Sequence, residues 1–163
     1  MASPASVAAH PIHPMIIPFP IALWVFSLVA DLIYLWRGNL VWRDWIAFYS
    51  LLGGILGAAL AAVFGIIDWL SITDRAVRKV ADWHARLNVI ALLVFAAGFY
   101  LRTVSGSKWI SGSYTIPLAL SVLGVILITI SGYLGGELVF RYGVAVNPQD
   151  DRGGQAGAKA RTS

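Results

Sequence analysis

Apolar residues occur along this chain in four long runs, separated by short polar links. The runs lie at about residues 15–36, 45–70, 84–101 and 116–140. About 20 helical residues cross the ~30 Å hydrocarbon core of a bilayer. Strands of a membrane barrel are shorter and alternate in polarity, and an open sheet cannot exist in lipid. The pattern therefore predicts an all-α membrane protein, an antiparallel four-transmembrane-helix bundle.

The four runs form one predicted domain, at residues 10–146. We expect residues 1–9 and 147–163 to be disordered tails, because neither has an apolar period. No internal repeat is evident from the pattern. The second run carries small residues at every fourth position, which lets membrane helices approach closely. These residues are Gly53, Gly57, Ala61 and Gly65.

Composition supports the membrane assignment and excludes several kinds of chemistry. Hydrophobic residues make up 58% of the chain and charged residues only 12%, against about 25% charged in soluble domains. The chain has no cysteine, which excludes disulfides, Cys-ligated iron–sulfur clusters, thioether-linked haem and thiol catalysis. It also lacks a Gly-x-Ser-x-Gly elbow and a phosphate-binding loop. Whether the protein is an enzyme stays open.

Basic residues predict how the bundle lies in the membrane. Four crossings place both chain termini at one end of the bundle, which we call the terminal end; the other is the distal end. Of the 12 Lys and Arg residues, eight fall at the terminal end and four at the distal end. The positive-inside bias places the terminal end in the cytoplasm. The modest net charge of +4 indicates lipid contacts rather than nucleic-acid binding.

Ionisable side chains gather at the predicted terminal end. Such groups in or near a bilayer are costly unless paired, solvated or liganded, and are therefore functional candidates. The candidates at the terminal end are His10, His13, Asp68, His84 and Glu137. Asp31 is a further candidate, at the distal end. Each also has an ordinary interpretation, since Asp68 could pair with Arg86 and Glu137 with Arg141.

Two His-Pro pairs precede the first run. The residue before a proline disfavours the helical conformation, so we expect His10 and His13 in extended or turn geometry. Pro18 and Pro20 can still open a helix, because the first N–H groups of a helix have no intrahelical partner. The first run is thus expected to follow a rigid, histidine-bearing entry segment.

Three functions fit this histidine-rich end. In the first, His13 and His84 bind haem b, which needs no cysteine, and small residues such as Gly65 and Ala61 make room for the macrocycle. In the second, a non-haem Fe, Zn, Cu or Mn ion is bound by His10, His13, Asp68 and His84. In the third, the protein is a non-catalytic membrane anchor or subunit of a partner complex. The helices could also assemble as a homo-oligomer.

Several short motifs resemble a known family. They are the doubled His-Pro, Asp31, the sequence Gly-Ile-Ile-Asp ending at Asp68, His84, and Gly-Gly-Glu-Leu-Val starting at Gly135. In order and spacing they are similar to the predicted bacterial membrane proteins of domain-of-unknown-function family 2231. Some relatives carry the domain joined to Rieske or cytochrome modules. The resemblance thus implies a bacterial inner-membrane location and a redox-associated role, with a separate redox partner protein because this chain has no appended redox module.

Overall fold

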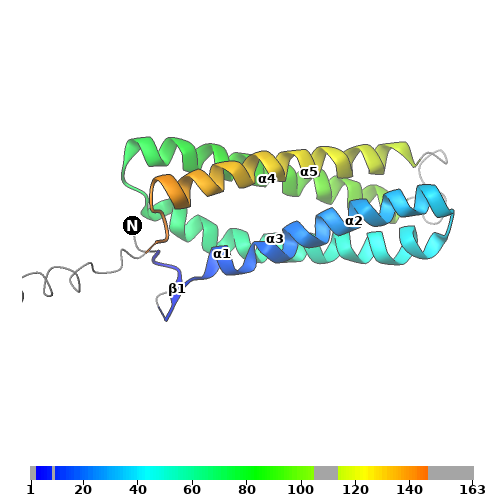
Figure 1. The fold of residues 1–163 in the computed structure, drawn as a ribbon, viewed down its shortest axis with the longest axis horizontal. Coiled ribbons are helices and arrows are strands. Elements are labelled where there is room, and N and C mark those ends of the chain that lie inside the picture. Colours follow the sequence, from blue (N-terminus) through cyan, green and yellow to red (C-terminus); the bar gives the residue numbers. More distant parts are fainter. Residues whose placement is uncertain (1–2, 9, 105–113, 147–163) are drawn as a thin grey trace, which may run out of the picture.

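The computed structural model describes residues 3–8, 10–104 and 114–146, and these form a long bundle of helices (Figure 1). Four helical segments of the described chain are long and apolar enough to cross a membrane. They span Ile12–Arg37, Trp42–Ser71, Arg75–Thr103 and Thr115–Arg141. Their large apolar side chains are widely exposed on the outer surface, as a lipid-facing surface requires. The predicted all-α four-helix class is confirmed.

Each span contains one long helix, and three of the four spans also contain a shorter helical segment. The elements, in order, are β1 (Ser6–Val7), β2 (His10–Pro11), α1 (Ile12–Ile16), α2 (Pro18–Arg37), η1 (Trp42–Ala47), α3 (Phe48–Ser71), α4 (Arg75–Val104), α5 (Thr115–Gly136) and η3 (Glu137–Arg141). The segments η1 and η3 are π-helical. Figure 1 shows the N-terminal strands, the start of α4 and the end of the last helix together at one end of the bundle. This is the terminal end.

Local sequence signals explain two of the boundaries. Gly38 ends α2 in the left-handed conformation, with φ of 69°, which glycine adopts without a Cβ penalty. The side chain of Asp74 accepts hydrogen bonds from the backbone N–H groups of Ala76 and Val77, at 2.7 and 3.1 Å. It thereby caps α4, so the polar link before His84 is already part of this helix.

The N-terminal segment differs from its prediction. Within the segment expected to be disordered, β1 pairs with β2 in antiparallel register. His10 is extended as expected, but His13 lies inside α1. Pro14 is tolerated there because it falls in the first turn of a five-residue helix, where its missing N–H costs nothing. The predicted tail at 147–163 lies outside the described residues.

An internal repeat, which the sequence pattern did not reveal, is visible in the contacts at the centre of the bundle. Trp24 of α2 packs over Gly54 of α3, and Phe95 of α4 packs over Gly124 of α5 in the same way. The two rings stack on each other with centroids 4.1 Å apart. The helical hairpin α2–α3 therefore has the same internal contact as the hairpin α4–α5.

Equivalent positions of the two hairpins also meet at the distal end. Asp31 lies seven residues after Trp24, and Arg102 lies seven residues after Phe95. These side chains form a bidentate ion pair in which both are fully buried. Contacts between equivalent residues at two levels are expected when parallel repeats surround a two-fold axis along the membrane normal. The bundle is accordingly a pair of similar hairpins.

The buried ion pair generates a stability prediction. Removing one partner leaves an uncompensated buried charge, so D31A or R102A should lower the free energy of unfolding by about 3–5 kcal/mol. The double variant D31L/R102M removes both charges and should recover most of that loss. Denaturant unfolding in mild detergent measures these effects. The control is E137A, which removes an exposed pair with Arg141 and should cost about 0–1 kcal/mol. A double variant as unstable as the single ones would contradict this account.

Candidate functional site

His13 is fixed to the neighbouring helix at the terminal end. Its Nδ1 atom lies 2.8 Å from the backbone carbonyl oxygen of Ala61 on α3. A carbonyl only accepts hydrogen bonds, so Nδ1 carries the hydrogen and Nε2 is left as a potential ligand atom. The ring lies against Gly65, where an added Cβ would be 2.9 Å from Cε1 of the imidazole. Glycine at this position therefore makes room for the histidine.

His84 has the same arrangement in the second hairpin. Its Nδ1 donates to the backbone carbonyl oxygen of Ser131 on α5, at 2.8 Å. An added Cβ at Gly135 would be 3.0 Å from Cε1 of this ring. In both hairpins the carbonyl and the glycine are four residues apart, and the histidine precedes the central aromatic residue by 11 positions. His13 and His84 are thus equivalent residues of the internal repeat.

The two histidines differ in their remaining partners. Asn88 donates from Nδ2 to Nε2 of His84 at 3.0 Å. The hydroxyl of Ser131 donates to the backbone carbonyl of His84 at 3.2 Å. In the first hairpin the equivalent positions hold Ile17 and Ala61, which offer no polar side chain. His84 therefore has a more polar setting than His13.

This pair of imidazoles has the chemistry of a ligand set. A metal-bound histidine usually donates its second ring N–H to a backbone carbonyl or carboxylate, which fixes the tautomer and the ring orientation. Both His13 and His84 make that bond through Nδ1. The arrangement presents two nitrogen donor atoms at one end of a membrane bundle.

The other predicted ligands lie in different surroundings. His10 is exposed in β2, and its Nδ1 bonds the carbonyl of Ala8 at 2.8 Å. Oδ1 of Asp68 accepts hydrogen bonds from the hydroxyl of Ser3 at 2.5 Å and from the N–H of Ala5 at 3.4 Å. Within residues 3–8, 10–104 and 114–146, no three His, Cys, Asp or Glu side chains lie together as a metal ligand set. The proposed four-residue set is therefore not assembled here, because Asp68 holds the N-terminal segment instead.

Two further expectations need adjustment. Ala61 and Gly65, expected to make room for a porphyrin, are contacted by the imidazole of His13 itself. Their small size thus accommodates the imidazole of His13. Glu137 pairs with Arg141 one turn later, at 3.1 Å, as the ordinary interpretation suggested.

Asp31 belongs to a separate polar cluster at the distal end. Besides Asp31, Arg102 also donates to the hydroxyl of Ser121 at 3.2 Å. Burial raises the pKa of Tyr114, just before α5, well above its usual range, and Asp31 adds to this effect. Arg43 pairs with Asp44 at 2.6 Å in the same region.

Sequence reasoning missed three partner residues: Asn88 and Ser131, which bond His84, and Arg102, which pairs with Asp31. A signal for Arg102 was present, since 18 residues separate His13 from Asp31 and also His84 from Arg102. Arg102 was counted only as a topology residue. Asn88 and Ser131 have no counterpart of the same kind in the first hairpin, so spacing alone could not identify them.

The family model described as "Predicted membrane protein (DUF2231)" matches residues 9–148. The chain belongs to this family of predicted membrane proteins. The match covers both hairpins, both histidines of the repeat and the buried ion pair. No curated protein matches the chain, and no solved structure matches it.

The glycine contacts of the two histidines can be tested by mutation. In G65A and G135A the added Cβ would lie closer to an imidazole carbon than ordinary van der Waals contact allows. Overpacking of this kind lowers the free energy of unfolding by about 1–3 kcal/mol. We expect both variants to lower the apparent melting temperature in detergent. The matched control is G132A on α5, where an added Cβ has no neighbouring atom within 4 Å. This control should be neutral or slightly stabilising, and a comparable loss in G132A would refute the packing role.

Proposed function

We propose that this membrane protein is redox-associated and binds haem b between the Nε2 atoms of His13 and His84. The observation that carries the proposal is the matching pair of Nδ1–carbonyl hydrogen bonds, at 2.8 Å in each hairpin. These bonds orient two imidazoles in the tautomer that a metal needs. A haem held by histidines from two helices of a bundle requires no cysteine, and this chain has none.

The residues at the site fit this ligand in their donor chemistry and set one condition on binding. Asn88 donates to Nε2 of His84, so a ligand on that atom must replace the amide. The carbonyls of Ala61 and Ser131 keep the rings oriented during this exchange. When bound, haem iron would supply one-electron transfer, and the electron would pass to or from a separate partner protein. The apolar bundle would limit access of water to the ligated nitrogens.

A second candidate ligand is a single Fe, Zn, Cu or Mn ion. The observation that favours it is the close fit of each imidazole against its glycine. An ion needs less rearrangement than a macrocycle at this end of the bundle. Two nitrogens alone do not complete a typical coordination sphere, so water or a partner residue would supply the remaining ligands.

We also propose the bacterial inner membrane as the location, with the terminal end in the cytoplasm. Support comes from the excess of Lys and Arg at that end and from the positive-inside rule. The histidine site would then face the cytoplasm, and the ion pair of Asp31 and Arg102 would lie toward the opposite surface. A cytoplasmic redox partner is the one that this orientation would serve.

The ligand is tested by a reduced-minus-oxidised visible spectrum and metal analysis of the protein purified in mild detergent. We expect a haem b spectrum in the wild type and its loss in H13A and H84A, because each variant removes one of the two histidines that would hold the haem. The matched control is H10A, which removes an exposed histidine bonded only to nearby backbone and should retain the spectrum.

The alternatives give different results in the same experiment. If the wild type contains a stoichiometric metal but shows no haem spectrum, and the metal is lost in H13A and H84A, the ligand is a metal ion and not haem. If the folded wild-type protein contains neither haem nor a metal ion, the result favours a structural membrane subunit and contradicts the redox proposal. Full cofactor occupancy in both H13A and H84A would reject these ligands.

The orientation is tested by labelling single introduced cysteines in whole cells and then purifying the protein. The wild-type chain has no cysteine, so any label on the purified protein is on the introduced residue. Asn39 lies exposed at the distal end, and Thr73 lies exposed in the link between α3 and α4 at the terminal end. A membrane-impermeant maleimide should label N39C in intact cells and T73C only after the membrane is opened. The reverse pattern would place the histidine site on the outer side.

A further inference from the structure

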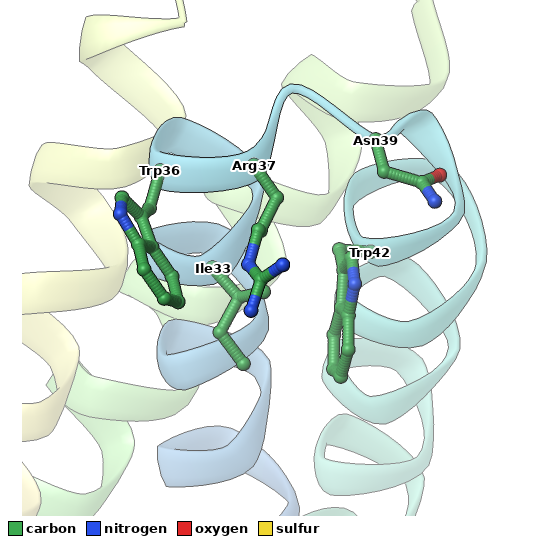
Figure 2. A pocket seen from close by; sticks show the side chains of 5 residues that line it. All are labelled: Ile33, Trp36, Arg37, Asn39 and Trp42. Carbon is green, nitrogen blue, oxygen red and sulfur yellow. The ribbon is translucent and has the colours of Figure 1, made fainter.

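A pocket at the distal end lies far from the histidines. It has a volume of about 510 Å³ and is lined by Ile33, Trp36, Arg37, Asn39 and Trp42. Figure 2 shows the two indole rings on opposite sides, with the guanidinium of Arg37 between them and Ile33 behind. The lining residues come from the end of α2 and the start of η1. The pocket is thus an aromatic-walled site that contains a cation.

The pocket lies at the end of the first membrane span, Ile12–Arg37, where lipid headgroups are expected. Tryptophans concentrate at the membrane–water interface, where the ring is half in lipid and the N–H is hydrated. Trp36 is 75% exposed and Trp45 63% exposed at this end of the bundle. Arg37 and Gly38 end α2 at the same level. A molecule in this pocket would have its polar part at the surface and its apolar part toward the bilayer.

Among the residues that the structure describes, no carboxylate pairs with Arg37 of the pocket. The two acidic residues of the distal end are Asp31 and Asp44, and they pair with Arg102 and Arg43. The guanidinium of Arg37 lies 4.2 Å from the ring centre of Trp36, a cation–π contact that leaves its N–H groups available. Guanidinium binds phosphate through paired, charge-assisted hydrogen bonds. The pocket therefore favours an anionic, phosphate-bearing amphiphile.

We propose that this pocket binds the headgroup of an anionic phospholipid. Arg37 binds the phosphate, the amide of Asn39 donates to the headgroup at the rim, and the glycerol backbone lies between Trp36 and Trp42. The acyl chains then continue over Ile33 along the lipid-facing side of α2. This site shares no residue with the histidine site, so its test does not depend on whether the proposed cofactor binds.

Native mass spectrometry of detergent-purified protein with phosphatidylglycerol or phosphatidylcholine tests the proposal. The wild type should retain phosphatidylglycerol in preference to phosphatidylcholine, and R37A should bind phosphatidylglycerol about tenfold more weakly. W42A, which removes one aromatic wall, should also weaken binding. The matched control is R86A, because Arg86 is another exposed arginine beside a tryptophan, 5.4 Å from the ring centre of Trp83 at the terminal end.

Three results would overturn the lipid site. They are equal binding of the two lipids by the wild type, equal losses in R37A and R86A, and undiminished binding in R37A that is folded by circular dichroism. A further contradicting result is displacement of phosphatidylglycerol by an equal concentration of inorganic phosphate, because the glycerol and acyl groups would then contribute nothing to binding. Failure of the haem spectrum would leave all of these readouts unchanged.

Discussion

The ion pair between Asp31 and Arg102 joins α2 to α4 inside the apolar part of the bundle, with both side chains fully buried. Two such charges are tolerated in a membrane only when each satisfies the other. Their geometry therefore constrains how the two hairpins lie against each other. The stacked rings of Trp24 and Phe95 are seven residues away on the same helices, so their contact depends on the same alignment. This buried ion pair thus links the register of α2 to that of α4.

Glycines let the two hairpins close around this axis. Gly54 and Gly124 receive the central aromatic rings, and Gly65 and Gly135 receive the imidazoles. In lipid there is no hydrophobic drive between helices, so close packing and hydrogen bonds supply most of the association energy. All four rings supply close packing against a glycine, and the two imidazoles also donate hydrogen bonds to backbone carbonyls. The repeat preserves this geometry although few residue identities are shared between the halves.

The internal repeat also gives the two ends of the bundle different chemistry. At the terminal end the equivalent residues are His13 and His84, which keep nitrogen donors. At the distal end the equivalent residues have opposite charges and neutralise each other. The proposed ligand site lies between the like residues, whereas the unlike pair is a buried ion pair. Asn88 breaks the equivalence of the two histidines and would make the two ligand bonds unequal.

The sequence by itself determined the class of protein, the four spans and the end of the bundle at which the histidines lie, because hydropathy and length alone decide what can cross a bilayer. It could not show that Arg102 pairs with Asp31, since these two residues are 71 positions apart in the chain and lie on different helices. Nor could it separate Asp68 from the histidines, because the deciding partners, Ser3 and Ala5, lie in a segment without any apolar period. These features depend on how the hairpins pack, and only the tertiary structure decided them.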